Sequence, residues 1–157
     1  MKEHDYHAHL IWDGNRGDGT STYEGYGRDY RVAIEGKPDI EGSANAAFQG
    51  DRRKHDPEDL FVAAIASCHM LAYLALCARH GIRVIAYEDR ARGRLVLAGP
   101  GHSRFHEVVL RPTVTIAAGD AELAAELHDM AHRGCFIANS CSVPIRHEAT
   151  IRVERAA

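Results

Sequence analysis

The sequence lacks a net positive charge, an N-terminal apolar run, internal repeats and low-complexity linkers. Its 157 residues carry 19 lysines and arginines against 22 aspartates and glutamates, a formal net charge of −3. This balance gives no general electrostatic case for binding nucleic acid. The opening residues, MKEHDYHAHLIW, contain no apolar stretch long enough for a signal peptide. We therefore expect a cytoplasmic protein without a nucleic-acid partner.

Only one segment, Pro57 to Cys77, approaches the length of a membrane span. It is rich in alanine and contains Glu58, Asp59 and His69, which favours a buried helix over a span. With 45% hydrophobic and 26% charged residues, the chain has the composition of a globular protein and the length of one ordinary domain. We predict a single domain over residues 1–157 and no membrane partner.

Alternating apolar residues predict strands, and helical periodicity predicts two helices between them. GKPDIEG is expected to form a turn, and Pro112 is expected to mark a sheet edge or a bulge. The element order indicates the α+β class, with antiparallel sheets packed against helices. The predicted strands cover residues 7–13, 20–26, 28–35, 82–88, 91–98, 105–117 and 142–154.

Both predicted helices have local start and stop residues. Pro57 suits the first turn of the long helix, Asp56 suits its N-cap, and Gly81 suits its end. The second helix is expected between an N-cap at Asp120 and a stop at Gly134. Since the long helix is apolar nearly all round, we expect it to be covered on most sides.

The four cysteines raise the question of function. In a reducing compartment, catalytic, redox and packing roles come before structural disulfides. Cys68 and Cys77 face nearly opposite sides of the long helix and cannot bond within it, so Cys77 is expected in the core. Cys135 follows the second helix, where a thiol has more freedom to move, and Cys141 is interpreted as a bystander. Simple burial is the alternative for each thiol.

The histidines suggest two further hypotheses. His128, His132 and Cys135 have offsets that suit a zinc site, but a clear fourth ligand is missing, and His128 is expected to face solvent. His69 beside Cys68 suggests a hydrolase pair. Adjacent helical positions point about 100° apart, which disfavours that pair.

Two motifs together resemble the OsmC/Ohr family, the osmotically inducible and organic hydroperoxide resistance proteins. D-P-E-D-L followed by S-C-H-M resembles the family helix, in which a proline-glutamate pair precedes the reactive cysteine. M-A-H-R-G-C-F-I-A-N-S resembles the second-cysteine segment, and W-D-G-N-R-G-D-G-T resembles the N-terminal hairpin with its arginine. These matches lie in order across almost the whole chain and look most like the OsmC-like branch.

The resemblance implies a thiol peroxidase without a cofactor, reduced by an external dithiol, for example of the lipoyl type. Cys68 matches the peroxidatic cysteine, Cys135 the resolving cysteine and Glu58 the glutamate of the proline-glutamate pair. Arg16 matches the arginine that pairs with this glutamate, although Arg28 lies close behind and leaves the choice open. The resemblance also implies an OsmC-like fold, with a long buried central helix, and an intertwined homodimer.

The implied chemistry has a physical basis. A buried thiol needs a cation or hydrogen-bond donor to become a thiolate, which Arg16 can supply while Glu58 holds the guanidinium. The thiolate of Cys68 attacks a peroxide to give a sulfenic acid, and Cys135 condenses with it to a disulfide. Apolar walls favour an organic hydroperoxide, including those of fatty acids. The expected wall residues are Leu60, Phe61, Ile65, Met70 and Leu71.

The helix length constrains this arrangement. On one straight helix, Glu58 and Cys68 are separated by about 15 Å, so the helix must break or a partner chain must bring its Glu58 across. The almost wholly apolar helix favours the second option, a homodimer about a two-fold axis. Two other hypotheses stay open. One is a protein of the same fold that binds a lipid or small hydrophobic ligand without turnover, and the other is the metal site.

Overall fold

The computed structural model describes residues 1–154, in two compact units whose boundary follows Leu60, inside the long helix. The first unit contains a three-stranded antiparallel sheet in the order β1-β2-β3. In this sheet Leu10 lies opposite Val32, and Val32 lies opposite Ile40. The elements of this unit before the long helix are β1 (His9–Trp12), β2 (Tyr30–Ala33), β3 (Ile40–Gly42) and the short 3-10 helix η1 (Ala46–Phe48).

The segment between β1 and β2 is a looped excursion and not the strand predicted at 20–26. Its backbone groups close local turns, with the amide of Gly25 donating to the carbonyl of Thr22 at 3.2 Å. The Trp12 indole N–H donates to the carbonyl of Gly27 at 2.8 Å and ties the two ends together. Backbone amides and carbonyls that a strand would use to pair with a neighbouring strand are therefore hydrogen-bonded within the loop. The expected turn GKPDIEG also contributes residues to β3.

Helix α1 (Pro57–Arg79) begins and ends as the sequence predicts. Asp56 accepts a hydrogen bond from the amide of Asp59 at 2.9 Å, the N-cap interaction that satisfies a free amide of the first turn. At the other end, Gly81 adopts a φ of 72°, a left-handed conformation that favours glycine. The amide of Ile82 donates to the carbonyl of Cys77 at 2.9 Å and closes the helix end.

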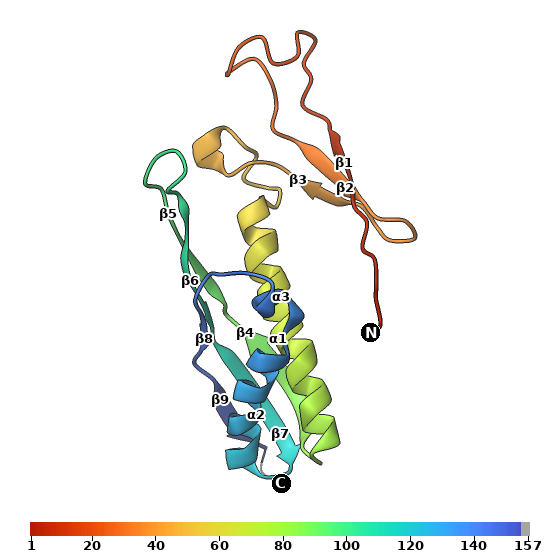
Figure 1. The fold of residues 1–157 in the computed structure, drawn as a ribbon, viewed down its shortest axis with the longest axis vertical. Coiled ribbons are helices and arrows are strands. Elements are labelled where there is room, and N and C mark those ends of the chain that lie inside the picture. The colour runs from red at the N-terminus through yellow and green to blue at the C-terminus, as the bar shows by residue number, and fades with distance from the viewer. Residues whose placement is uncertain (155–157) are drawn as a thin grey trace. The chain divides into compact units, whose positions relative to one another are not determined.

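The second unit packs helices against two three-stranded sheets (Figure 1). The strand orders are β4-β7-β9 and β5-β6-β8. The elements after α1 are β4 (Arg83–Asp89), β5 (Arg92–Val96), β6 (Arg104–Leu110), β7 (Pro112–Ala118), α2 (Ala121–Gly134), α3 (Phe136–Asn139), β8 (Ile145–His147) and β9 (Thr150–Val153).

Two details of these sheets differ from the prediction. The expected strand 105–117 is divided at Arg111, where the chain leaves one sheet and Pro112 begins the next. Proline is tolerated as the first residue of a strand because no ladder amide is needed there. The expected strand 142–154 is also divided, and its halves β8 and β9 pair in parallel with β6 and β7. The sheets are therefore mixed, and the α+β class is confirmed.

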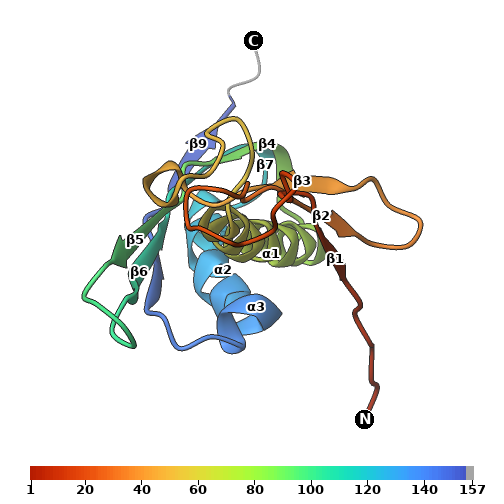
Figure 2. The same ribbon diagram turned by 90° about the horizontal axis from the view of Figure 1, so that it is seen from above.

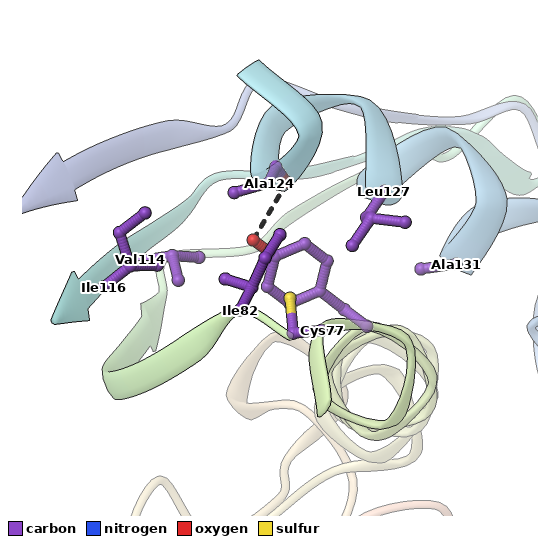
Figure 3. Close-up of a cluster of buried hydrophobic side chains, with 8 residues drawn as sticks. Cys77, Ile82, Val114, Ile116, Ala124, Leu127 and Ala131 are labelled. Carbon is purple, nitrogen blue, oxygen red and sulfur yellow. Dashed lines mark hydrogen bonds between the residues drawn. The ribbon is translucent and has the colours of Figure 1, made fainter. Parts of the chain in front are cut away.

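The main core of the second unit lies between α1, α2 and the sheet of β4 and β7 (Figures 2 and 3). At its centre, the Tyr73 hydroxyl donates to the carbonyl of Ala124 at 2.9 Å. A second cluster joins α1 to β6 through Ile65, Val108 and Leu110. The buried residues of the main core are Tyr73, Cys77, Ile82, Val114, Ile116, Ala124, Leu127 and Ala131.

The second unit buries one face of α1. The buried side chains follow one another at intervals of four residues and form one stripe: Ile65, His69, Tyr73 and Cys77. On another face, Leu71 is 63% exposed. Only 22% of the most apolar window of this helix is buried among the described residues, so the expected cover on its other sides stays a prediction that depends on a second copy of the chain. Among residues 1–154, α1 is also the one helix whose length and composition suit a membrane span.

Candidate active site

The thiols of Cys68 and Cys135 are neighbours, although they come from opposite ends of the second unit's sequence. Cys68 lies on α1 and is partly exposed, whereas Cys135 directly follows α2 and is 1% exposed. Burial, and then the adjacent Cys68 thiol, raises the pKa of Cys135 to about 11. Both cysteines are free thiols. Cys135 is therefore protonated at neutral pH and lies beside the sulfur with which the predicted disulfide forms.

Cys135 also connects two helices. Its amide donates to the carbonyl of His132 at 3.3 Å at the end of α2, and its sulfur accepts from the amide of Ala138 at 3.4 Å at the start of α3. The hydrogen bond to sulfur opposes the rise in the pKa of Cys135, because it stabilises the thiolate. Phe136 is the first helical residue of α3.

Arg16 and Glu58 both belong to the first unit, whereas Cys68 and Cys135 belong to the second. Among residues 1–154, no ion pair links Arg16 to Glu58. Helix α1 is continuous from Pro57 to Arg79, so Glu58 and Cys68 are about 15 Å apart along its axis. The helix break considered from the sequence is absent in this described segment.

The surroundings of Arg28 distinguish it from Arg16. The Arg28 guanidinium lies 3.9 Å from the ring centre of Tyr26 and 4.4 Å from that of Tyr23. It also donates to the carbonyls of Tyr26 and Tyr23 at 2.5 and 2.6 Å. Arg28 is thus occupied in holding the loop between β1 and β2, whereas Arg16 is exposed. This difference favours Arg16 as the arginine available to a thiol.

The other two cysteines lie apart from this pair. Cys77 is 1% exposed in the main core, and burial raises its pKa, as expected for a packing residue. Cys141 is partly exposed, and its thiol donates to the carbonyls of Ile137 and Ala138 at 3.3 and 3.5 Å. These two hydrogen bonds hold the Cys141 side chain against the backbone of α3.

His69 and His128 form a buried pair that the sequence did not predict. His69 Nε2 lies 3.0 Å from His128 Nδ1, and the ring planes differ by 5°. His128 also stacks on Tyr73, with ring centres 3.8 Å apart. His147 lies within 5.7 Å of both rings and hydrogen-bonds Asp129 through Nε2 at 2.9 Å. Its pairing with a carboxylate links the group to the surface of α2.

The expectation that His128 faces solvent is wrong, because its side chain is fully buried. Burial, and then the neighbouring histidines, lowers the pKa of His69 to about 4 and that of His128 to about 3. Both imidazoles are therefore neutral at pH 7. The sequence does contain one relevant pattern, since His69 and Tyr73 are four residues apart on an apolar helix. Only the fold reveals that His128 meets them.

The hypothesis of a metal site on His128, His132 and Cys135 does not fit this geometry. Within residues 1–154, no group of three or more histidine, cysteine, aspartate or glutamate side chains is arranged to hold a metal ion. His128 Nδ1 points toward His69, and the Cys135 thiol lies beside Cys68. The three side chains therefore have different neighbours.

A groove of about 720 Å³ lies on the second unit beside β6 and the segment that follows α3. Of the wall residues expected from the sequence, Phe61 lines it and packs against Phe105, with ring centres 5.0 Å apart. Ile65 lies instead in the core, and Leu71 is exposed on α1. The groove residues are Phe61, Leu95, Ser103, Arg104, Phe105, His106, Cys141, Ser142, Val143 and Pro144.

Comparison with known proteins agrees with this fold. A family model described as OsmC-like protein matches residues 49–149, well over half of the chain. The chain therefore belongs to the OsmC-like protein family. It is also 22% identical over 159 residues to YmaD of Bacillus subtilis (strain 168), an uncharacterized protein, with 98% of each chain covered.

Solved structures show the same architecture. An OsmC-like protein of unknown function from Vibrio cholerae has a TM-score of 0.82 and 31% identity, covering 95% of this chain and 99% of that chain. An organic hydroperoxide resistance protein from Elizabethkingia anophelis has a TM-score of 0.63 and 17% identity, covering 98% of this chain and 100% of that chain. The second likeness establishes a shared fold alone.

Proposed function

We propose that the protein is a thiol peroxidase that reduces organic hydroperoxides, with Cys68 as the peroxidatic and Cys135 as the resolving cysteine. The observation that carries the proposal is the proximity of these two free thiols, one on α1 and one after α2. The family supports it, since organic hydroperoxide resistance proteins share this fold. The reaction takes place in the cytoplasm, where thiols are kept reduced.

The chemistry proceeds in three balanced steps. The Cys68 thiolate attacks the terminal peroxide oxygen, the O–O bond breaks, and the alkoxide takes up a proton to leave as an alcohol. The Cys135 thiol then attacks the sulfenic acid sulfur, which forms the disulfide and releases water. An external dithiol, of the lipoyl type, reduces the disulfide by exchange and becomes oxidised itself.

Activation of Cys68 is assigned to a second copy of the chain. Arg16 and Glu58 of the partner subunit form the charged pair beside Cys68, because one continuous helix keeps a chain's own Glu58 too far away. Arginine is suited to this role, since it stays charged and pairs with a carboxylate through two hydrogen bonds. The incompletely covered face of α1 supports the dimer, since an exposed apolar surface favours association.

The direct test is consumption of cumene hydroperoxide with dihydrolipoamide, comparing the wild type, Cys68→Ser and Cys141→Ser. We expect turnover in the wild type and loss of turnover in Cys68→Ser. We expect Cys141→Ser to retain turnover, because the Cys141 thiol only donates to backbone carbonyls nearby. Absence of turnover in wild-type protein whose cysteines are shown by thiol titration to be reduced would contradict the proposal. So would equal losses in both variants, because the effect would then not be specific to Cys68.

One observation favours a second function, the binding of a hydrophobic ligand without turnover. The groove beside β6 has a volume of about 720 Å³ and an aromatic floor of Phe61 and Phe105, a size typical of small-molecule sites. Arg104 at the groove suits an acidic end group on such a ligand. Binding of a fluorescent fatty acid, weakened by Phe105→Ala in protein that lacks peroxidase turnover, would support this alternative.

A further inference from the structure

The buried imidazoles of His69 and His128 form a directional link between two helices. The nitrogens are 3.0 Å apart, the planes differ by 5°, and the ring centres are 5.3 Å apart. Rings this far apart and this nearly parallel are joined edge to edge by an N–H···N hydrogen bond rather than face to face. Such a bond fixes both the separation and the orientation of the residues that make it.

This link is costly for a core. Among residues 1–154, the outer nitrogens, His69 Nδ1 and His128 Nε2, are buried without a protein partner. A neutral imidazole has one N–H and one lone-pair nitrogen. Whichever ring donates to the other, one end of the pair is left with an unpaired donor and the other with an unpaired acceptor. An unpaired buried donor or acceptor destabilises the folded state, so two leucines would suit packing alone better.

The link defines a register between α1 and α2. Tyr73 on α1 donates to the carbonyl of Ala124 on α2, and His69 contacts His128. A step of four residues toward the N-terminus of α1, from Tyr73 to His69, therefore matches a step of four residues toward the C-terminus of α2. This is the arrangement of antiparallel helices. Both hydrogen bonds are buried and join this one helix pair, so sliding or turning of α2 would break them.

The two thiols lie at positions that this register controls. Cys68 directly precedes His69 on α1, and Cys135 directly follows the last residue of α2. We propose that His69 and His128 are positioning residues that hold α2 against α1 in the register at which Cys135 reaches Cys68 for disulfide formation. The use of this positioning in catalysis rests on the proposed function, whereas the positioning itself does not depend on peroxide.

The geometric demand of a disulfide explains why positioning matters here. The Cβ atoms must approach to about 3.5–4.5 Å, and the C–S–S–C dihedral must be near a right angle. Condensation of the Cys68 sulfenic acid with the Cys135 thiol forms the S–S bond and releases water, so it needs the same approach. A displacement of about 1 Å at such a site changes rates by about a hundredfold.

The test compares two double variants. His69→Leu/His128→Leu removes both partners and both unpaired nitrogens, so the core remains apolar and should fold. His69→Gln/His128→Asn places amides near Nε2 of residue 69 and Nδ1 of residue 128 and can restore a hydrogen bond. Ile116→Ala is the control for general destabilisation, because Ile116 is fully buried in the same core but lies on β7.

The readout is the effective concentration of Cys68 for Cys135, measured by mass spectrometry in glutathione redox buffers at pH 7.5. Cys77 and Cys141 are replaced by serine in every protein. We expect the leucine pair to lower this value at least tenfold, and the amide pair and Ile116→Ala to keep it within about threefold of the parent. A leucine pair equal to the parent, or Ile116→Ala lowered as much as the leucine pair, would overturn the inference.

A second arm separates this inference from the proposed function. One equivalent of cumene hydroperoxide is added, and the Cys68 sulfenic acid is trapped with dimedone. In the leucine pair we expect more trapped sulfenic acid and less disulfide than in the parent. If the parent reacts with no peroxide while the redox-buffer difference persists, the peroxidase proposal fails and the positioning role stands. If peroxide oxidises Cys68 equally and disulfide forms equally fast in both proteins, the positioning role fails.

Discussion

Tyr73 lies face to face with His128, with ring centres 3.8 Å apart and planes inclined by 10°. The same tyrosine donates through its hydroxyl to the carbonyl of Ala124, one turn away along α2. One side chain of α1 thus contacts α2 both by stacking and by hydrogen bonding, in a fully buried environment. The charge state of His128 should therefore affect the stability of the whole second unit.

Acid should destabilise the protein through this cluster. Burial lowers the pKa of His69 to about 4 and that of His128 to about 3, whereas both titrate near pH ~6.5 in an unfolded chain. Below about pH 6.5 the unfolded state therefore binds protons that the folded state does not. The free energy of unfolding then decreases as the pH is lowered, until the folded pKa values are reached. Urea unfolding should show a slope of about 1.4–2.7 kcal/mol per pH unit near pH 5 from this pair.

The matched variant for this measurement is His69→Gln/His128→Asn, which cannot titrate at these positions. Its stability should lose this part of the slope while keeping the part due to surface carboxylates such as Asp51, whose pKa the Arg53 side chain lowers to about 2. Identical slopes in the two proteins would show that the histidine pair does not contribute.

The two candidate arginines should behave differently. Arg16→Gln should lower the rate of Cys68 oxidation by about 10- to 100-fold without a large loss of stability, because its side chain is exposed. Arg28→Gln should instead destabilise the first unit, because the guanidinium contacts two tyrosine rings and two carbonyls. Stopped-flow oxidation kinetics and thermal unfolding of both variants test the assignment. The reverse pattern would make Arg28 the activating residue.

The exposed side of α1 should determine the oligomeric state. Leu71→Asp should shift the protein toward monomer in analytical ultracentrifugation at micromolar concentration, because Leu71 is 63% exposed on an apolar helix. Leu97→Asp is the control, since Leu97 is 61% exposed but lies in the segment after β5. A monomeric wild type, or equal effects of both changes, would remove the support for a dimer along α1.

Loss of the second thiol should expose the first to over-oxidation. With Cys135→Ser, one equivalent of hydroperoxide should leave the Cys68 sulfenic acid unresolved, and excess peroxide should convert it to the sulfinic acid. Intact-mass measurements distinguish these products from the disulfide expected in the wild type. Disulfide formation at the same rate in Cys135→Ser would identify Cys141 as the resolving residue.

Local sequence predicted the parts of the fold that local interactions determine. The ends of both long helices were correct because Asp56, Gly81 and Asp120 act through neighbouring backbone groups. The segment 20–26 was predicted as a strand because its residue types favour one, but Arg28 and backbone turns organise it as a loop. Residue type alone could not reveal this, since the competing contacts depend on the folded loop.

Long-range contacts limited how much of the site could be predicted from the sequence. The family resemblance implied that Cys68 and Cys135 are redox partners, which stays a prediction, and the structure places their thiols beside each other. The motifs did not predict the pair His69 and His128, because no local pattern reports which histidines meet across two helices. The same limit applies to Arg16, whose proposed role depends on a second chain.

The parallel strands β8 and β9 give this chain an order of assembly. Each contributes the third strand of its sheet, beside β6 and β7 respectively, and both follow all the other strands in the sequence. During synthesis on a ribosome, neither sheet of the second unit can be completed until residues 145–153 have emerged. Such late, non-local pairing makes folding slow, so the apolar surface of α1 and the thiol of Cys68 are made early and must await their final cover.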